Sequence, residues 1–292
     1  RRDGRPQTGL YPDSVSLHGA ASDHQLDLSG AGDQRGAVRP RAAAADPYIL
    51  DTLHRLLQME NNRKYLDIAC GTGNYTIGLA KKNDNVTIYG VDQSEWMISS
   101  AKRKSHLPNL VWMVGDAAHL HFESNFFDGI VCTQAIHHFD NFTSAFKEMY
   151  RVLKGEGGRF VIFSSTKEQM DHYWLKYYFP KMMEKSIRQM PSSDDIIKSL
   201  TEAGFVHIQS LPYSVTEDLE DLFLYSGKTR PEIYLHPEVR AGISSFANLS
   251  DSKEIESGLQ LLKEHIDSGY VWEVISNFDL SSSDYTFFVA QK

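Results

Sequence analysis

The chain of 292 residues contains no long uninterrupted run of apolar residues. No stretch approaches the roughly 18–20 consecutive apolar residues of a membrane-spanning helix, and the N-terminal segment lacks the apolar run of about 7–15 residues of a secretory signal. We therefore expect no membrane span and a cytoplasmic location. The two cysteines, Cys70 and Cys132, are too few for a disulfide scaffold or for a zinc site of their own, so we expect no metal site.

An excess of positive charge is also missing. The formal net charge is −8, with 30 Lys and Arg against 38 Asp and Glu. The summed field repels polyanions, so binding to nucleic acid or to an anionic membrane would need a strong local basic patch. The best candidate, Lys102-Arg103-Lys104, is short, and we expect no nucleic-acid partner. Hydrophobic residues make up 41% of the chain, which excludes a fibrous or wholly disordered protein.

Residues 1–46 differ in composition from the rest of the chain. They hold six Arg and six Asp but no Lys and no Glu, and they show no sustained helical or strand period. Their scattered Gly, Pro, Ser and Asp predict an irregular N-terminal arm. Two interpretations stay open: a flexible segment foreign to the folded domain, or a lid over an active site.

From residue 47 onward the pattern predicts an α/β fold. One apolar helix face begins the domain at 49–57, and short apolar runs then alternate with helical patterns, of which Ala145–Lys154 is the clearest. Continuous apolar strands separated by helices are typical of a parallel sheet covered on both faces. The predicted strands are Lys64–Ala69, Val86–Val91, Leu110–Val114, Phe127–Cys132, Arg159–Ser164, Val206–Val215 and Asp284–Ala290.

Two segments are too long to be simple connections. Residues 167–190 are aromatic-rich and helical, and residues 216–283 carry a helical pattern of their own. We interpret both as insertions that form a helical cap on one domain spanning 47–292. Between them, a helix is predicted at Ser193–Ala203, with Ser192 or Ser193 as N-cap and Gly204 as its end.

The most informative stretch is an apolar strand that breaks into a Gly-x-Gly turn before a helix. Gly71 and Gly73 allow a sharp backbone turn and let a ligand approach without a Cβ in the way. A dinucleotide fingerprint would place a third glycine at position 76, where this chain has Thr76, which counts against NAD. Asp67 lies within the strand, where it suits a cationic amino group or the amides of the turn better than a diphosphate. An ordinary tight connection remains the alternative.

Polar residues also follow the next three strands. Asp92 comes 21 positions after Gly71, where a carboxylate can accept hydrogen bonds from both hydroxyls of a ribose. Asp116 follows the third strand and could accept from the amine of adenine, although an Asp there also forms turns. The fourth strand is followed by Gln134, His137 and His138.

Over residues 48–166 the chain resembles the class I S-adenosylmethionine-dependent methyltransferases, in the branch with many small-molecule and quinone methyltransferases. The resemblance implies a Rossmann-like, mostly parallel seven-stranded sheet of order 3-2-1-4-5-7-6 with the last strand antiparallel. It implies that Asp67, Gly71 and Gly73 hold the methionine end of S-adenosyl-L-methionine, that Asp92 takes the ribose and that Gln134 lines the methionine pocket. It further implies cofactor contacts at Ala69, at Gln93, at Met97 beside the adenine, and at Asp116 and Ala117 along the adenine edge.

The expected reaction is transfer of the sulfonium methyl group to an O, N or C nucleophile of a small molecule, leaving S-adenosyl-L-homocysteine. His137 or His138 is the candidate base if the acceptor must lose a proton. Trp174, Tyr177 and Tyr178 would share a helix face as a substrate wall, or as a packing face. The alternatives are a non-catalytic cofactor-binding or partner-regulating protein, an NAD-dependent oxidoreductase, and an RNA or protein methyltransferase.

Overall fold

The computed structural model describes residues 44–155, 157–278 and 282–292. The predicted irregular arm, 1–46, lies outside the described residues except for its last three positions. Asp46, the last of these, caps the first helix, because its Oδ1 accepts a hydrogen bond of 3.0 Å from the backbone N–H of Ile49.

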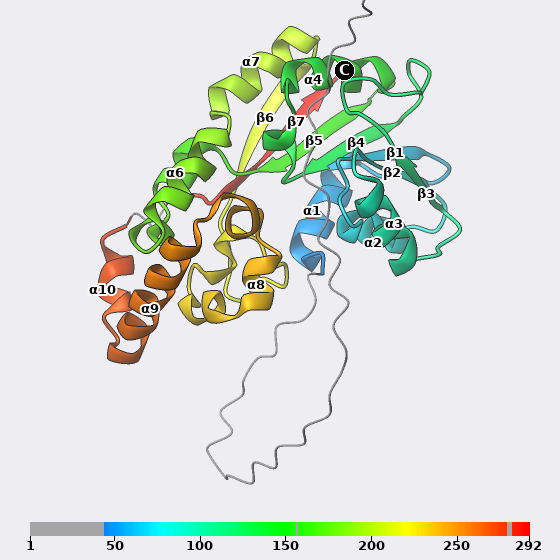
Figure 1. The fold of residues 1–292 in the computed structure, drawn as a ribbon. Coiled ribbons are helices and arrows are strands. Elements are labelled where there is room, and N and C mark those ends of the chain that lie inside the picture. The colour runs from blue at the N-terminus through cyan, green and yellow to red at the C-terminus, as the bar shows by residue number, and fades with distance from the viewer. Residues whose placement is uncertain (1–43, 156, 279–281) are drawn as a thin grey trace, which may run out of the picture. The chain divides into compact units, whose positions relative to one another are not determined.

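A seven-stranded sheet forms the centre of the described domain, in the order β3-β2-β1-β4-β5-β7-β6 (Figure 1). The first five strands are parallel, and β7 runs antiparallel to both β5 and β6. This confirms the predicted fold class and strand order. The strands are β1 Lys64–Ile68, β2 Thr87–Asp92, β3 Leu110–Val114, β4 Gly129–Thr133, β5 Arg159–Ser164, β6 Val206–Tyr213 and β7 Tyr285–Gln291.

Helices cover both faces of the sheet because successive strand residues point to opposite sides. Along β5, Val161 and Phe163 pack in one apolar cluster with α1, whereas Phe160 and Ile162 pack in a second cluster with α4 and α7. The α-helices are α1 Pro47–Leu57, α2 Asn74–Lys82, α3 Glu95–Lys104, α4 Phe142–Val152, α5 Lys167–Asp171, α6 Pro180–Gln189, α7 Ser193–Ala203, α8 Pro237–Ala241, α9 Ser252–Ser268 and α10 Val271–Ser276. Shorter helical turns are η1 Ile136–His138, η2 Trp174–Tyr177, η3 Leu224–Gly227, η4 Pro231–Leu235 and the π-helical η5 Ser245–Leu249.

Helix α7 forms over the predicted residues, with Ser192 and Asp195 in a reciprocal capping box and Gly204 as its end. Helix α4 begins three residues before the prediction, because the side chain of Asn141 accepts from the N–H of Ser144 and caps it there. The predicted helical segment 167–190 is broken into α5, η2 and α6.

We call the helical segments 167–190 and 216–283 the cap. The first follows β5, and the second lies between β6 and β7. In the antiparallel register Ser164 is opposite Thr286, and Tyr213 is opposite Tyr285. The end of β5, the end of β6 and the start of β7 therefore share one edge of the sheet, which is also the carboxyl edge of the parallel strands. Both parts of the cap emerge at this edge, and in Figure 1 helices α8, α9 and α10 lie together on one side of it.

Buried polar contacts tie the cap to the sheet. Lys228 and Asp284 form an ion pair with distances of 2.9 and 2.8 Å, and the two side chains are only 7% and 6% exposed. Asp284 also accepts from the N–H of Val215 at 2.7 Å. Because a buried ion pair needs good geometry to offset desolvation, these contacts specify where the cap meets the strands.

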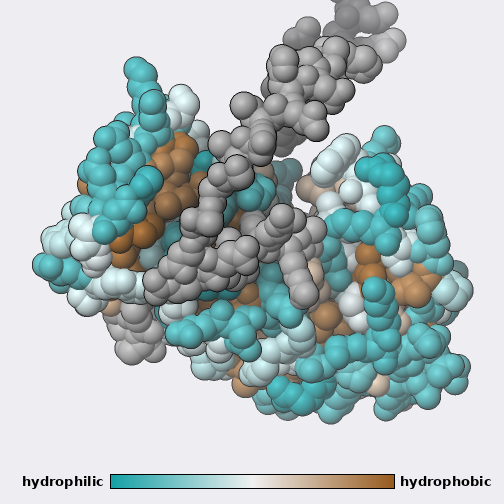
Figure 2. All heavy atoms as spheres, turned by 90° about the horizontal axis from the view of Figure 1, so that it is seen from below, coloured by the Kyte–Doolittle hydropathy of each residue, from teal (hydrophilic) through white to brown (hydrophobic). Residues whose placement is uncertain are grey.

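Exposed apolar side chains are scattered over the described surface. Figure 2 shows hydrophobic residues in separate groups among hydrophilic ones where the face is not covered by grey atoms. The most exposed aromatic residues, Tyr48, Trp96 and Trp272, belong to three different helices or their ends. Within the described ranges, no helix combines the length and the apolar character needed to cross a bilayer.

Candidate active site

The Gly-x-Gly turn connects β1 to α2 at the carboxyl edge of the sheet. The N–H of Gly73 donates to the carbonyl of Cys70 at 2.9 Å, and Gly73 caps α2 in the left-handed region, with φ of 78°. Gly71, with φ of 55°, donates its N–H to Oδ2 of Asp92 at 2.8 Å. Ala69 also has a positive φ, 53°, which is costly for a residue with a Cβ. Backbone strain of this kind is often stored at functional sites.

The two glycines of the turn are required for different reasons. A Cβ on Gly73 would lie 2.3 Å from the indole ring of Trp112, so this glycine makes room for protein packing. A Cβ on Gly71 would meet nothing within 4 Å, so the space in front of this glycine is open to a ligand. Trp112 also lies against Gly90, its register partner on β2. We did not predict the role of Trp112, although a glycine inside a strand is a known signal of close approach.

Asp67 is completely buried on β1 beside the start of α2. Its Oδ2 accepts from Oγ1 of Thr76 at 2.6 Å, and its Oδ1 has no partner among the described residues. Burial raises the pKa of Asp67 to about 7; the hydrogen bond from Thr76 opposes this shift, and the charge of Asp92 adds to it. An unpartnered buried carboxylate oxygen is costly, so it marks a place suited to a positively charged or hydrogen-bond-donating ligand group.

Asp92 ends β2 and connects two loops. In addition to Gly71, it accepts from the N–H of Ser94 at 2.9 Å, through Oδ1. Each carboxylate oxygen can accept a further hydrogen bond, so both retain capacity for a ligand hydroxyl. Ser94 in turn caps α3, where its hydroxyl accepts from the N–H of Met97 at 3.3 Å. The two other residues predicted to contact the cofactor lie close by in the chain. Gln93, in the loop before α3, is exposed, and Met97, in the first turn of α3, is partly buried.

Lys104, at the end of α3, reaches the glycine turn. Its Nζ donates to Oγ1 of Thr72 at 2.5 Å and to Oδ1 of Asn74 at 2.8 Å. Partial burial lowers the pKa of this ammonium. This residue is one of the three in the basic cluster Lys102-Arg103-Lys104, and here it fastens α3 to the turn.

Asp116 follows β3 and is exposed. Its two oxygens accept from the N–H of Ala118 at 2.9 Å and contact Nδ1 of His119 at 3.0 Å, and the first of these bonds is the main reason why the pKa of Asp116 is lowered. The carboxylate therefore forms a local turn. Ala117, beside it, is buried. The predicted contacts of both residues with an adenine remain predictions.

At the end of β4 the chain is again strained. Gln134 has a φ of 53°, and its N–H donates to the carbonyl of Phe163 on β5 at 2.7 Å. His137 and His138 follow on η1, with their ring centroids 4.0 Å apart. Burial lowers the pKa of His137 to about 3, and its Nδ1 has no partner among the described residues. Burial also lowers the pKa of His138, while the charge of Asp92 raises it. Predicted residues at the ends of three strands thus lie close enough to interact electrostatically: Asp92 after β2 acts on Asp67 of β1 and on His138 after β4.

The predicted aromatic wall is divided between core and surface. Trp174 is fully buried, and its indole N–H donates to the carbonyl of Lys228 at 3.1 Å. Tyr178 is also buried and contacts Nδ1 of His265 at 3.0 Å, whereas Tyr177 is 48% exposed. The three rings lie in a row, because the ring centroid of Tyr178 is 5.9 Å from that of Trp174 and 5.1 Å from that of Tyr177. They come from the short turn η2 and the residue after it, where an α-helix was expected. Their role toward a substrate stays a prediction.

Tyr75 and Asp221 form a further contact at this edge, which sequence reasoning missed. Tyr75 is the second residue of α2, and its hydroxyl donates to Oδ2 of Asp221 in the cap at 2.8 Å; both side chains are buried. Burial raises the pKa of Asp221 to about 6, and the hydrogen bond from Tyr75 opposes this. Asp46 joins them, because its Oδ2 accepts from the N–H of Glu220 at 3.2 Å. The cap therefore contacts the helix that follows the glycine turn.

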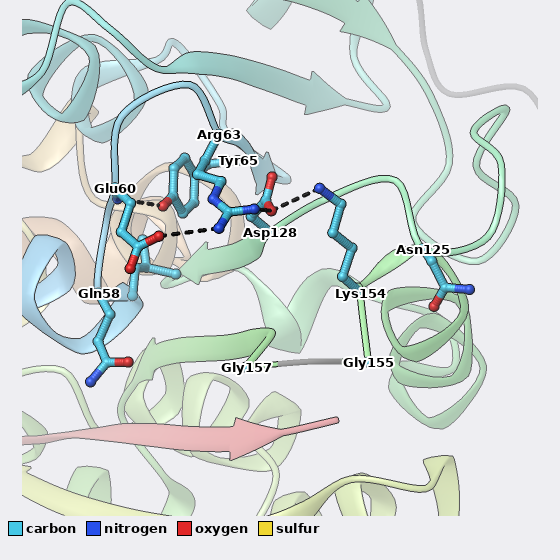
Figure 3. Close-up of a pocket in the computed structure, with 10 residues that line it drawn as sticks. Gln58, Glu60, Arg63, Tyr65, Asn125, Asp128, Lys154, Gly155 and Gly157 are labelled. Carbon is cyan, nitrogen blue, oxygen red and sulfur yellow. Dashed lines mark hydrogen bonds and ion pairs between the residues drawn. The ribbon is translucent and has the colours of Figure 1, made fainter.

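A cavity of about 440 Å³ opens at the opposite edge, where β1, β4 and β5 begin (Figure 3). Its charged groups satisfy one another: Asp128 contacts Arg63 at 3.2 Å and Lys154 at 2.8 Å, and Arg63 contacts Glu60 at 3.3 Å. None of the predicted site residues lines this cavity. Over the described chain, no group of three or more His, Cys, Asp or Glu side chains is placed to hold a metal ion.

Comparisons with known proteins agree with this geometry. The methyltransferase domain family matches residues 66–162, from β1 to β5. A crystal structure titled a putative methyltransferase from an antibiotic biosynthesis pathway of Anabaena variabilis is 31% identical, covers 86% of this chain and 99% of its own, and has a TM-score of 0.77. Demethylmenaquinone methyltransferase of Geobacillus sp. (strain WCH70) is 26% identical over 187 residues, which are 56% of this chain and 79% of that protein.

More distant structures share the fold alone. Phosphoethanolamine N-methyltransferase 2 of Haemonchus contortus, in complex with S-adenosyl-L-methionine, is 20% identical, with 83% of this chain and 51% of that chain covered and a TM-score of 0.54. Together, the strand order, the glycine turn and the 31% identity over nearly the whole of the Anabaena protein place this chain in the family of class I S-adenosylmethionine-dependent methyltransferases.

Proposed function

We propose that this protein transfers a methyl group from S-adenosyl-L-methionine to an O, N or C nucleophile of a small molecule. The observation that carries the proposal is the arrangement at the glycine turn. The space in front of Gly71 is open, Gly71 donates to Asp92, and the charge of Asp92 acts on Asp67, whose Oδ1 is buried without a partner. Bound there, the cofactor supplies an electrophilic sulfonium methyl group.

The residues of the turn fit the two polar ends of this cofactor. Asp67 would compensate the cofactor's ammonium group, because its Oδ1 is the acceptor that lacks a donor. Asp92 would accept from the ribose hydroxyls with the remaining capacity of its two oxygens. Ala69, Gly71, Gly73 and Gln134 would shape the methionine pocket, and Gln93, Met97, Asp116 and Ala117 the side of ribose and adenine.

The acceptor would lie between this edge and the cap. The main contribution of the protein would be to hold the donor and the nucleophile in line and away from water, an effect that can remove about 7–11 kcal/mol of the barrier in favourable cases. If the acceptor must lose a proton, His138 is the better base. Burial holds the pKa of His137 at about 3, where imidazole is a weak base, whereas Asp92 supports the protonated form of His138.

A small molecule as acceptor is supported by the relatives named as demethylmenaquinone methyltransferases and by the negative net charge. A non-catalytic cofactor-binding or regulatory role is the second candidate. It is favoured by the length of the cap, which lies outside the residues 66–162 matched by the methyltransferase family. Retention of the cofactor without turnover over a broad panel of acceptors would support it.

The experiment that tests the proposal is calorimetric titration with S-adenosylhomocysteine and, separately, with NAD. We expect only the former to bind, and we expect Asp92→Asn and Asp92→Ala to weaken it. Because Asp92 also holds Gly71 and Ser94, circular dichroism of each variant must match the wild type. Asp84→Asn, which changes an exposed carboxylate in the turn before β2, is the matched control and should leave binding unchanged. Binding of NAD instead, or of neither ligand, would contradict the proposal.

A further inference from the structure

Two polar groups of the cap, Ser226 and Arg230, contain buried atoms without a hydrogen-bond partner. Of the buried unpartnered side-chain atoms among the described residues, Oγ of Ser226 and Nε of Arg230 are the two that belong to the cap. Ser226 is only 2% exposed. The two residues are adjacent, because Nη2 of Arg230 donates to the carbonyl of Ser226 at 3.3 Å.

The guanidinium of Arg230 is held in place by neutral groups. Nη2 donates to the carbonyls of Leu219 at 3.1 Å and of Ser226 at 3.3 Å. Within the described ranges Arg230 forms no ion pair. The charge of Arg230 helps to lower the pKa of Asp218, whose main stabilising contact is the hydroxyl of Thr216. A partly buried cation whose acidic neighbour lies beyond ion-pair distance is poorly compensated, because backbone carbonyls do not neutralise it.

The position of this pair relates it to the candidate active site. Leu219, which accepts from Arg230, begins the three-residue segment that reaches α1 and α2. Its neighbour Glu220 donates its N–H to Asp46, and the next residue, Asp221, accepts from Tyr75 at the start of α2. Three consecutive cap residues thus lead from Arg230 to the helix that follows the glycine turn.

We propose that Arg230 and Ser226 form an anion-binding subsite for the methyl acceptor, which would carry a carboxylate or phosphate group. A guanidinium N–H and a serine hydroxyl both donate hydrogen bonds to such oxygens, and a negative group would supply the acceptor that Nε of Arg230 and Oγ of Ser226 lack. The inference rests on the proposed function, since it assigns a chemical class to the acceptor of that reaction.

The test follows the Nε–H signal of Arg230 by NMR in full-length protein labelled with ¹⁵N-arginine. The signal is assigned by its loss in Arg230→Lys. Inorganic phosphate and acetate are titrated separately, with and without saturating S-adenosylhomocysteine, against chloride at equal ionic strength. We expect a saturable shift with one or both anions and none with chloride; the ratio of the two affinities distinguishes a phosphate-bearing acceptor from a carboxylate-bearing one.

Variants assign the binding to these residues. We expect Arg230→Gln to lower the affinity for the anion by about tenfold or more, as loss of a hydrogen bond from a charged group would. Arg230→Lys should retain part of the wild-type affinity, and Ser226→Ala should lose part of it. Arg240→Gln is the matched control, because Arg240 also donates to a cap carbonyl, that of Tyr234. If Arg230→Gln does not fold, the wild-type titration and Arg230→Lys still decide the question.

The outcomes separate the two proposals. If S-adenosylhomocysteine binds but neither anion shifts the Arg230 signal, only water occupies the subsite and this inference is overturned while the proposed function stands. If an anion binds saturably and S-adenosylhomocysteine does not, the subsite exists and the proposed function fails. If the anion shifts the signals of other arginines equally in the wild type and in Arg230→Gln, the anion binds elsewhere and the inference is overturned.

Discussion

Thr76 donates a hydrogen bond of 2.6 Å to one oxygen of Asp67, while the other oxygen of this fully buried carboxylate has no partner among the described residues. The position where a dinucleotide site would need a third glycine is thus occupied by a residue that stabilises the ionised form of an acid. Burial nevertheless raises the pKa of Asp67 to about 7. Its charge, and any cation it binds, therefore depend on pH near neutrality.

We predict that the affinity for S-adenosylhomocysteine rises with pH between about 5 and 7 and levels off above. At low pH Asp67 is protonated and cannot compensate the ammonium group of the ligand. Asp67→Asn should bind more weakly at pH 8 and show a flat profile, and Thr76→Val should move the inflection to higher pH, because its hydrogen bond opposes the rise in pKa. Calorimetry from pH 5 to 8 measures this; a wild-type affinity independent of pH would rule out the assigned role.

The same carboxylate affects the stability of the protein without ligand. Its pKa is higher in the folded state than the ordinary value of about 3.9, so ionisation disfavours folding. The free energy of unfolding should fall as pH rises from about 4 to about 7, by up to a few kcal/mol. Asp67→Asn should make this dependence smaller in urea denaturation, leaving the part that comes from Asp221, whose pKa is also raised, to about 6. If the free energy of unfolding instead increases from pH 4 to pH 7, and increases equally in the wild type and in Asp67→Asn, other groups dominate and the raised pKa of Asp67 does not determine the pH dependence.

A second prediction concerns the packing of Trp112 against Gly73. We expect Gly73→Ala to lower the free energy of unfolding by about 2–5 kcal/mol, since it combines a left-handed backbone with a Cβ placed 2.3 Å from the indole. In a Trp112→Leu background the same change should cost about 1–2 kcal/mol, because the backbone strain and a close approach of 3.2 Å to Cβ of Ala101 remain. The coupling in a double-mutant cycle measures the contact.

Gly71→Ala is the control for this cycle. Its φ is also positive, but a Cβ there meets nothing within 4 Å, so its cost should be the same with Trp112 as with leucine. Its effect should instead appear as weaker binding of S-adenosylhomocysteine. Equal costs of Gly73→Ala in both backgrounds would refute the packing role of Trp112.

The sequence predicted the sheet well because each parallel strand is a short apolar run with helices on both sides. The Gly-x-Gly turn and Asp92 also came together as expected, since carboxyl ends of parallel strands meet at one edge. The cap was less predictable. Periodicity indicated helices in 167–190 but not the breaks within them. Nor did it show that Trp174 is buried and Tyr177 exposed, because this depends on distant cap residues such as Tyr234 and His265.

Contacts between segments far apart in the chain were missed for a related reason. Nothing local marks Asp221 as the partner of Tyr75, 146 residues away, or shows that Nε of Arg230 is buried without a hydrogen-bond partner. The pairing of Gly90 with Trp112 could have been suspected from a glycine inside an apolar strand, once the register was known. Composition and motif order therefore suffice to predict the proposed donor side of the site, whereas the proposed acceptor side can be argued only from the folded cap.

A third prediction concerns the buried pair of Tyr75 and Asp221. Burial raises the pKa of Asp221 to about 6, so its ionised form disfavours folding, and stability falls as pH rises from about 4 through about 6. Tyr75→Phe removes a donor that stabilises the ionised form. We expect it to cost about 1–3 kcal/mol at pH 8 and less at pH 5, measured by urea denaturation.

Asp221→Asn provides the comparison for Tyr75→Phe. With no carboxylate to ionise, adding Tyr75→Phe should cost nearly the same at both pH values. If Tyr75→Phe alone already costs the same at pH 5 and pH 8, the hydroxyl does not act on the charge of Asp221, and the link between the cap and α2 is apolar packing only.

The last prediction separates the two histidines after β4. If His138 removes a proton from the methyl acceptor, turnover should fall at acidic pH, where His138 is protonated. The inflection should lie below pH 6.5, because burial lowers the pKa of His138 from that ordinary value. His138→Gln should reduce kcat by about 10²–10⁴ and remove the inflection. His137→Gln should keep the inflection, since burial holds the pKa of His137 at about 3. Both variants must bind S-adenosylhomocysteine with the affinity of the wild type, so that a lower kcat cannot be caused by weaker binding of the methyl donor. Unchanged turnover of His138→Gln at every pH would mean that the acceptor reaches the site already ionised or needs no base.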